Sequence, residues 1–255
     1  MLFAGKSVIV TGSAGSIGGA IASAFAAEGA DLGLIDLKPS QATRDAILAF
    51  GRKAIDQPAD VADRGQVIRS VSAITENLGG VDILVNASGI TSFGSAATLD
   101  EAEWDRVLAI NLKGVFLCCQ AVIGPMRKKD AGGRIINIGS LLGKNGGNAR
   151  PWLDPTEQTG SGNVAYGVSK AGVHAMTVYL ARELASAKIT VNAVAPGPIV
   201  SPMTQAFPER MKSLIPLGRM GTPEEVAAAV LFLAGDKAGF ITGEILDVNG
   251  GTWAD

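Results

Sequence analysis

The chain has 255 residues, of which 47% are hydrophobic, and its formal net charge is −2. This length fits one large domain or two small ones, and the apolar fraction supports a substantial core and excludes a largely disordered chain. Because the net charge is slightly negative and no dense stripe of lysine and arginine is present, a nucleic-acid-binding protein is not expected.

Apolar runs of strand length alternate with helical patterns along the chain. Runs rich in Ile, Leu and Val are typical of strands covered on both faces, and they lie at 7–10, 31–36, 81–85, 134–138, 189–194 and 244–248, with a weaker strand near 53–57. Amphipathic stretches between them, such as 112–126, predict helices. The alternation predicts an α/β fold, a doubly wound, Rossmann-like parallel sheet of about seven strands with helices on both faces. No repeat or linker divides the sequence, so we expect a single domain over 1–255.

The first predicted strand ends in a glycine-rich turn, TGSAGSIG, which opens a helix. In this context we expect the turn to hold the pyrophosphate of a dinucleotide, because the amides and dipole of a helix N-terminus favour an anion. The spacing is G-x-x-G-x-x-G instead of the usual G-x-G-x-x-G. The residues expected to contact the cofactor here are Gly12, Gly15, Ser16, Ile17 and Gly18.

Asp36 ends the second predicted strand. An acid at this position can accept hydrogen bonds from the ribose hydroxyls of adenosine, and it repels a 2′-phosphate. The sequence therefore favours NAD over NADP. Lys38 is the nearby counter-argument, since a cation could hold that phosphate.

Cys118 and Cys119 are adjacent within a helical pattern, which suits neither a disulfide nor a zinc site. We expect both to be buried packing residues, and we predict no metal site. The N-terminus is not typical of a signal peptide, and no uninterrupted apolar run reaches membrane-spanning length. These features predict a cytoplasmic protein with no membrane partner.

The segment YGVSK places Tyr166 and Lys170 one turn apart on the same face of a helix. Together with the glycine turn, this motif resembles the short-chain dehydrogenase/reductase family, and the resemblance covers nearly the whole chain. The altered glycine spacing is shared with a longer branch of that family that acts on nucleotide sugars. Too few residues follow Lys170 for that branch's separate substrate domain, so the chain resembles the compact branch.

The resemblance implies a catalytic set, Asn111, Ser140, Tyr166 and Lys170. Tyr166 is implied as the acid and base, and work near neutral pH requires its pKa to fall from about 10. Lys170 is expected to favour the phenolate by its charge and to bind the nicotinamide ribose. Ser140 is expected to donate a hydrogen bond to the substrate oxygen. Asn111 is expected to hold a water that links Lys170 to solvent.

Further cofactor contacts follow from the same resemblance. Asp60 and Val61 match the pair that holds the adenine. The segment VNASG resembles the family's N-N-A-G, in which Asn86 and Gly89 match and the two residues between them depart. In NAVAPGPIVSPM, the residues expected along the nicotinamide side are Pro196, Gly197, Ile199 and Ser201.

A polar stretch rich in Gly and Pro, residues 143–163, separates Ser140 from Tyr166 and predicts a loop. The separation of Ser140 and Tyr166 is about twice as long as usual in the compact branch, and the glycines at 143, 146, 147, 160 and 162 are expected to act as hinges. Both ends flank the reacting carbon, so we expect 144–163 to form part of the substrate pocket or its lid, hinged by its glycines. Candidate substrate contacts are Ser140, Arg150, Trp152 and Tyr166. The alternative is a surface flap or a subunit contact. The polar composition favours a sugar, a polyol or a hydroxy acid as substrate.

These features predict an NAD-dependent oxidoreductase that interconverts a secondary alcohol and a ketone. The alternatives are an NADP-dependent 3-oxoacyl-thioester reductase and, from another class, a catalytically silent NAD-binding sensor. The resemblance also implies a homotetramer. His174, the only histidine, lies one turn beyond Lys170, and the sequence leaves its role open between proton transfer and packing at a subunit contact.

Overall fold

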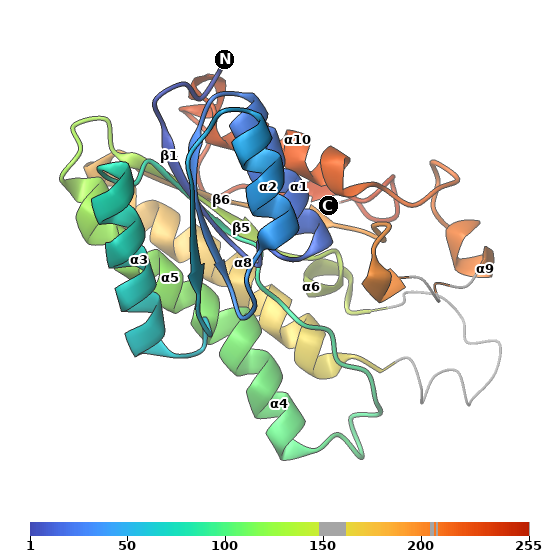
Figure 1. Cartoon of the computed structure of the whole chain (residues 1–255). Helices are drawn as coiled ribbons and strands as arrows, with labels where there is room; N and C mark the ends of the chain where they lie inside the picture. Colours follow the sequence, from blue (N-terminus) through green and yellow to red (C-terminus); the bar gives the residue numbers. More distant parts are fainter. Residues whose placement is uncertain (148–161, 205–206, 208, 255) are drawn as a thin grey trace.

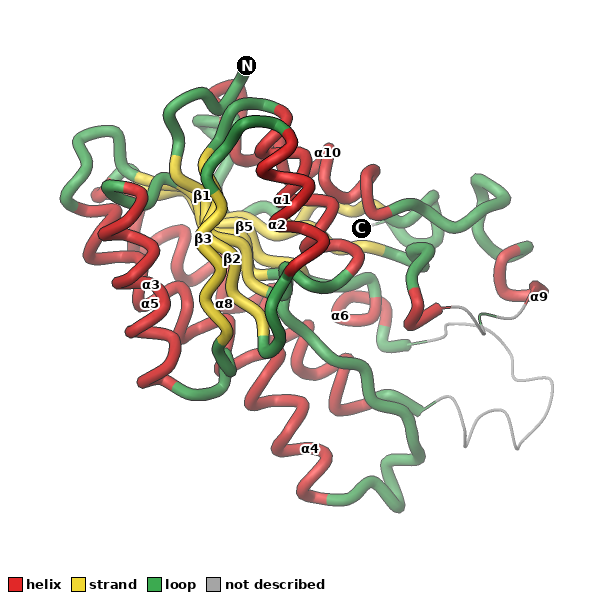
Figure 2. The backbone as a smooth tube through the Cα atoms, in the orientation of Figure 1, coloured by secondary structure: helices red, strands yellow, loops and turns green. Residues whose placement is uncertain are grey.

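Seven parallel strands form one sheet in the order β3-β2-β1-β4-β5-β6-β7 in the computed structural model of the chain, which describes residues 1–147, 162–204, 207 and 209–254 (Figures 1 and 2). The strands are β1 (Ser7–Thr11), β2 (Asp31–Asp36), β3 (Ala54–Pro58), β4 (Ile83–Asn86), β5 (Gly133–Ile138), β6 (Ile189–Pro196) and β7 (Ile245–Val248). The predicted fold is confirmed, including the weak third strand. The chain moves outward from β1 to β3 and then returns to β4 on the other side of β1. This switch point is where open parallel sheets bind ligands.

Helices cover both faces of the sheet (Figure 1). One face carries α1 (Ser16–Ala27), α2 (Gln41–Ala49) and α10 (Pro223–Ala234), and the other carries α3 (Arg64–Leu78), α5 (Gly114–Arg127) and α8 (Val164–Leu184). Along β1, Val8 and Val10 pack into the core on the α1 side, whereas Ile9 packs into the core on the α5 side. Because both faces are covered, the central strands β1 and β4 are mostly apolar.

A continuous helical run joins α4 (Glu101–Leu108), a π-helical turn η1 (Ala109–Lys113) and α5. The sequence predicted a helix over 112–126 but not the π turn, a distortion that often marks a functional site. By length and composition alone this run is long and apolar enough to cross a membrane, although polar residues interrupt its apolar stretch. Core helices meet the same criteria, and here Val122, Met126 and the two free cysteines are buried against the sheet.

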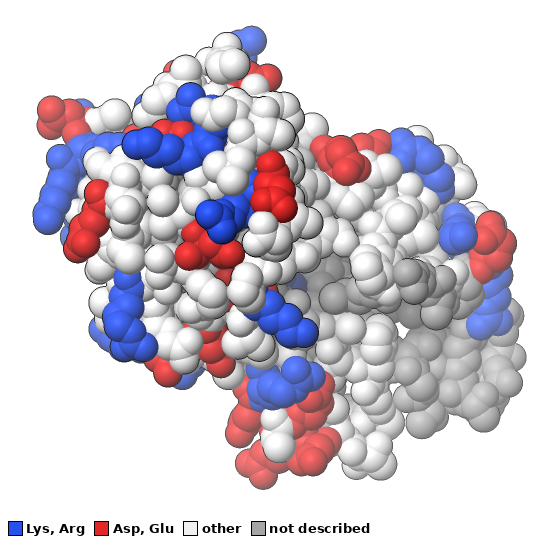
Figure 3. All heavy atoms as spheres, viewed as in Figure 1, with Lys and Arg blue, Asp and Glu red and all other residues white. Residues whose placement is uncertain are grey.

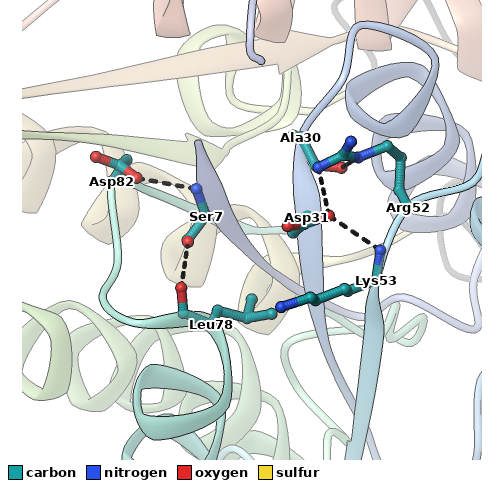
Figure 4. Close-up of polar contacts among 7 residues, drawn as sticks. All are labelled: Ser7, Ala30, Asp31, Arg52, Lys53, Leu78 and Asp82. Carbon is teal, nitrogen blue, oxygen red and sulfur yellow. Dashed lines mark hydrogen bonds and ion pairs between the residues drawn. The ribbon is translucent and has the colours of Figure 1, made fainter. Parts of the chain in front are cut away.

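Polar side chains fix the amino ends of the first strands, opposite the edge that carries the glycine turn (Figure 4). Asp82, just before β4, accepts a hydrogen bond of 2.9 Å from the backbone N–H of Ser7 in β1. Asp31, at the start of β2, pairs with Arg52 at 2.7 Å and accepts the N–H of Lys53 at 3.0 Å. These contacts hold the strands in register.

Short elements complete the described chain. They are α6 (Leu142–Asn145), η2 (Ala185–Ala187), η3 (Pro202–Thr204), α9 (Glu209–Lys212) and η4 (Asp236–Ala238). Residues 142–145 are therefore helical, although the sequence predicted a loop from 143. On the surface shown in Figure 3, basic and acidic side chains are interspersed over the described residues.

Candidate active site

The glycine turn between β1 and α1 lies against the loop that follows β4. Gly12 adopts a positive φ of 67°, and a Cβ there would lie 2.7 Å from the backbone of Ala87. A Cβ on Gly18 would overlap the carbonyl oxygen of Gly12. The turn therefore requires glycine at both positions. Thr11, which the sequence analysis missed, accepts hydrogen bonds from the N–H groups of Ala87 and Ser88 at 3.1 and 3.2 Å and so joins the two loops across the switch point.

The first turn of α1 fits the phosphates of a dinucleotide. Gly15 is the N-cap, and within the described chain no side chain caps this end and no acid lies in its first turn. The amides of Ser16, Ile17 and Gly18 are therefore available to an anion. Because the side chain of Ile17 packs on the core, this residue would contact a cofactor through its backbone.

Asp36 is held beside this turn by two backbone groups. Its carboxylate accepts hydrogen bonds from the N–H of Ala14 at 3.0 Å and from the N–H of Lys38 at 3.3 Å. The position suits an acceptor for the adenosine ribose. The structure thus places the predicted specificity residue next to the predicted phosphate site.

The predicted adenine pair follows β3. The carboxylate of Asp60 accepts a hydrogen bond from the N–H of Ala62 at 2.8 Å. Val61 is buried and packs on Gly114, since a Cβ added to Gly114 would lie 2.8 Å from the Val61 side chain. After β6, the N–H of Gly197 donates to β7, Ile199 is buried, and the N–H of Ser201 donates to a threonine side chain. These placements are compatible with the predicted cofactor contacts, which stay predictions.

The side chain of Asn86 lies in the core and is not exposed at the predicted cofactor site. Its side-chain Nδ2 donates to Asn137 at 2.9 Å and to Cys119 at 3.3 Å, and it is almost fully buried. Any cofactor contact of Asn86 would therefore use its backbone. Gly89 lies closer to the catalytic groups, because a Cβ there would lie 3.5 Å from the Nζ of Lys170.

Ser140, Tyr166 and Lys170 converge at the carboxyl end of β5. Ser140 lies two residues beyond the end of the strand, and α8 carries the other two residues one turn apart. The side chain of Ser140 lies near enough to that of Tyr166 to lower its pKa. The Nζ of Lys170 lies 5.8 Å from the centroid of the Tyr166 ring and donates to the carbonyl oxygen of Ile138 at 2.7 Å. The motif spacing in the sequence therefore corresponds to one cluster in space.

Burial controls the protonation of this cluster. Desolvation raises the pKa of Tyr166, and the hydrogen bond with Ser140 only partly opposes this rise. Desolvation also lowers the pKa of Lys170 to about 8. In the chain by itself, removal from water disfavours the phenolate more than the neighbours of Tyr166 favour it, so the lowering of the pKa that catalysis requires stays a prediction for the complex with the oxidised cofactor.

Asn111, in the π turn, connects the loop after β4 with α8. Its side chain accepts the N–H of Ile90 at 2.8 Å and donates to the carbonyl of Ile90 at 2.9 Å. It also donates to the hydroxyl of Ser169 at 3.1 Å, and this hydroxyl in turn donates to the carbonyl of Tyr166 at 2.7 Å. Sequence analysis missed Ser169, although its position within the Tyr166 to Lys170 motif was a signal. The structure gives the Asn111 side chain a bracing role, and its water-holding role stays a prediction.

The insertion between Ser140 and Tyr166 is described only at its two ends, and Arg150 and Trp152 lie outside the described residues. At the first end, Lys144 donates to Asp247 at 2.9 Å and to the carbonyl of Ile245 at 3.1 Å. At the second end, Gly162 accepts the N–H of Gly94 at 2.7 Å.

The glycines at these ends differ from the expected hinges. A Cβ on Gly162 would overlap the oxygen of Gly94, and a Cβ on Gly143 would lie 2.8 Å from the backbone of α8. Both glycines are therefore close-contact positions, because neighbouring backbone fills the space of a side chain. Gly146, with φ of 71° and open space around it, keeps the character of a hinge.

Comparison with known proteins gives consistent results. A family model described as enoyl-(acyl carrier protein) reductase matches residues 12–252. The chain is 40% identical to the (2S)-[(R)-hydroxy(phenyl)methyl]succinyl-CoA dehydrogenase subunit BbsD of Thauera aromatica, over 95% of this chain and 94% of the relative. It is 39% identical to the 3-oxoacyl-[acyl-carrier-protein] reductase FabG of Thermotoga maritima, over 98% of this chain and 99% of the relative. A solved short-chain dehydrogenase/reductase from Serratia marcescens superposes with a TM-score of 0.89 at 33% identity and covers 100% of both chains.

Proposed function

The chain belongs to the short-chain dehydrogenase/reductase family of oxidoreductases, and we propose that it interconverts a secondary alcohol and a ketone with NAD as its cofactor. The observation that carries this proposal is the convergence of Ser140 and Tyr166 at the carboxyl end of β5, beside the buried ammonium of Lys170. This cluster lies at the carboxyl edge of the sheet, where the glycine turn also lies. A proton donor and an oxygen-binding group are thus available next to a dinucleotide site.

Each residue of the cluster is assigned a separate role in the reaction at the substrate oxygen. When bound, a nicotinamide supplies the chemistry of hydride transfer. In the oxidising direction, the phenolate oxygen of Tyr166 takes the proton from the alcohol, and in the reducing direction the hydroxyl of Tyr166 gives its proton to the carbonyl oxygen. Ser140 holds the same substrate oxygen through its hydroxyl and stabilises negative charge there. The positive charge of Lys170 favours the phenolate form of Tyr166.

Asp36 supports NAD as the cofactor. Two backbone N–H groups fix its carboxylate beside the glycine turn, where it can accept the ribose hydroxyls. A 2′-phosphate at the same position would meet a negative charge. In the contact between Lys38 and Asp36, the backbone N–H of Lys38 donates to the carboxylate at 3.3 Å.

For the substrate, two classes remain in competition. The polar composition of residues 144–163 favours a small polar alcohol, such as a sugar, a polyol or a hydroxy acid. The names of two relatives favour a 3-oxoacyl thioester, because one is an acyl-carrier-protein reductase and the other a CoA-ester dehydrogenase. Both classes undergo the same conversion at a secondary carbon. A silent NAD sensor is disfavoured by the presence of the full set, Asn111, Ser140, Tyr166 and Lys170.

A substrate panel separates these possibilities. Formation or consumption of reduced nicotinamide would be followed with polar alcohols, 3-hydroxyacyl thioesters and the corresponding ketones, each with NAD and with NADP. Turnover of polar alcohols with NAD supports the proposal, and NADP-dependent turnover of the thioesters alone supports the alternative. Tight NAD binding without turnover of any compound would support the sensor.

The proposal includes a homotetramer in the cytoplasm. The apolar residues Phe116 on α5 and Val164, Val168 and Tyr179 on α8 are exposed. Exposed apolar side chains of this kind, on helices next to the active site, fit contacts between copies of a symmetric assembly.

A further inference from the structure

The segment that follows β5 and carries Ser140 continues to bond with β6 beyond the point where β4 ends. The N–H groups of Gly139 and Leu141 donate to carbonyls of β6. Because successive residues of a strand alternate in direction, the carbonyl of Ile138 and the N–H of Ser140 point toward the side of β4. However, β4 ends at Asn86, which pairs with the strand before this point. Two buried backbone groups next to the active site therefore need partners from elsewhere.

Two side chains of α8 supply these partners. Lys170 donates to the carbonyl of Ile138 at 2.7 Å, and the Nε2 of His174 accepts the N–H of Ser140 at 3.3 Å. The side chains are one helical turn apart, and their residues are only 4% and 8% exposed. Side chains of α8 thus take the place of the backbone groups that β4 would supply if it were longer.

Two glycines leave space for the imidazole. A Cβ on Gly139, directly before Ser140, would overlap the Nε2 and Cδ2 atoms of His174. A Cβ on Gly143 would lie 2.9 Å from its Cε1 atom. The segment 139–143 is therefore shaped around the ring of His174. This fit is independent of the hydrogen bond to Ser140.

We propose that His174 is a positioning residue for Ser140, a role that rests on the proposed function. By accepting the backbone N–H, it holds Ser140 where its hydroxyl reaches Tyr166. An Nε2 that accepts a hydrogen bond carries no proton, so the imidazole is neutral with its proton on Nδ1. His174 therefore does not transfer a proton in the reaction, and it acts through the geometry of Ser140.

Kinetics test this role with a matched pair of variants. His174→Gln keeps an acceptor near the position of Nε2, whereas His174→Leu fills the space without an acceptor. Loss of one buried hydrogen bond predicts a kcat lower by roughly 3- to 10-fold for His174→Leu, with NAD affinity and KM nearly unchanged and with His174→Gln close to wild type. Equal kcat values for His174→Leu and wild type would overturn the inference.

Ser140→Ala separates this inference from the proposed function. If Ser140→Ala keeps full activity, the catalytic role of Ser140 fails, and the role of His174 fails with it. If Ser140→Ala is inactive and His174→Leu is unaffected, only the role of His174 fails. Gly139→Ala provides a second route, because it should displace the ring and lower kcat, and combining it with His174→Leu should add little further loss. Additive losses would contradict a shared cause.

Nitrogen NMR of the wild-type protein tests the geometry without a variant. The chain has a single histidine, so ¹⁵N-labelled histidine gives one unambiguous pair of ring signals once any affinity tag is removed. We expect a protonated Nδ1 and an unprotonated Nε2 at neutral pH. A proton on Nε2 would overturn the inference, because that atom could not then accept the N–H of Ser140.

Discussion

The carboxylate of Asp36 lies 3.0 Å from the backbone nitrogen of Ala14 and accepts its hydrogen bond. This contact joins the end of β2 to the glycine turn after β1, although the two residues are far apart in the sequence. The donor is a backbone N–H, so this hydrogen bond holds the Asp36 carboxylate in place without ordering a second side chain. A fixed acceptor loses little entropy when it binds a ribose, so this geometry favours selective recognition of NAD.

Replacement of this acid should change cofactor preference. Asp36→Ala removes both the ribose acceptor and the charge that repels a 2′-phosphate, so we expect weaker NAD binding and better use of NADP. A lost charge-assisted hydrogen bond corresponds to about 1.5–3 kcal/mol, or roughly 10- to 100-fold in Kd. Asp45→Ala, on the exposed face of α2, is the control for loss of one negative charge. A wild type that already prefers NADP in parallel kinetics would contradict this prediction.

The role of Tyr166 can be tested with the other tyrosine as a control. Tyr166→Phe keeps the ring but removes the proton carrier, so kcat should fall by about 10²- to 10⁴-fold while NAD affinity stays close to wild type. Tyr179→Phe makes the same chemical change at a residue that is 77% exposed and should leave kcat unchanged. Activity of Tyr166→Phe within a few-fold of wild type would disprove the assignment.

The sheet and the position of the site were predictable because local sequence encodes them. Central strands covered on both faces are mostly apolar, and the glycine, Asp36 and Ser140 signals lie at or just beyond the carboxyl ends of strands. The spacing of Tyr166 and Lys170 likewise needs only the geometry of a helix. These features depend on a few neighbouring residues.

Other features depend on how separate elements pack, and the sequence did not predict them. The acceptor role of His174 depends on where β4 stops relative to β5. The raised pKa of Tyr166 depends on burial by several elements. A glycine in a sequence also does not reveal whether its missing side chain allows a hinge or a close contact, and Gly143 and Gly162 prove to be close contacts.

The buried Lys170 should make stability depend on pH. Its pKa is about 8 in the folded chain against 10.5 as the reference value, so the unfolded chain binds more protons between these values. The free energy of unfolding therefore gains a contribution that rises with pH through this window, by at most about 3 kcal/mol. Below pH 8 the ammonium is charged in both states and its burial is a constant cost.

Chemical denaturation at a series of pH values measures this contribution. The stability of wild type relative to Lys170→Met should rise as the pH rises through this window, whereas the lost hydrogen bond to the carbonyl of Ile138 contributes an offset that does not change with pH. Lys128→Met, at the exposed end of α5, controls for the loss of one positive charge. A difference between Lys170→Met and wild type that does not change with pH would contradict the prediction.

The assembly should be a homotetramer that uses the exposed apolar side of α8. Light scattering at working concentration should give four times the chain mass of 26.0 kDa. Tyr179→Glu places a charge on this side and should shift the protein toward smaller species, because burying an unpaired charge is costly. Leu48→Glu, at an exposed leucine of α2, should leave the assembly intact. A monomeric wild type would disprove the prediction.

The polar insertion should contribute to the substrate pocket. Its described ends are tied down beside the active site, by Lys144 to Asp247 at 2.9 Å and by Gly162 to Gly94 at 2.7 Å. Since Ser140 and Tyr166 stand at these ends, the residues between them leave and return next to the reacting carbon. Within this stretch, Arg150 offers a planar fork that suits a carboxylate, and Trp152 offers a flat apolar surface.

Alanine variants of these two residues test the contribution directly. Arg150→Ala should raise KM by roughly 10- to 100-fold if the substrate carries a carboxylate, because a charge-assisted hydrogen bond is lost, and Trp152→Ala should lower kcat/KM through lost contact area. Arg127→Ala, at the exposed end of α5, is the control for loss of an arginine and should leave KM unchanged. Because we propose that NAD binds at the glycine turn, we expect its affinity to stay the same in all three variants. If both KM and kcat/KM on the true substrate are unchanged in Arg150→Ala and Trp152→Ala, these residues do not touch the substrate, and the insertion then serves as a surface flap or a subunit contact.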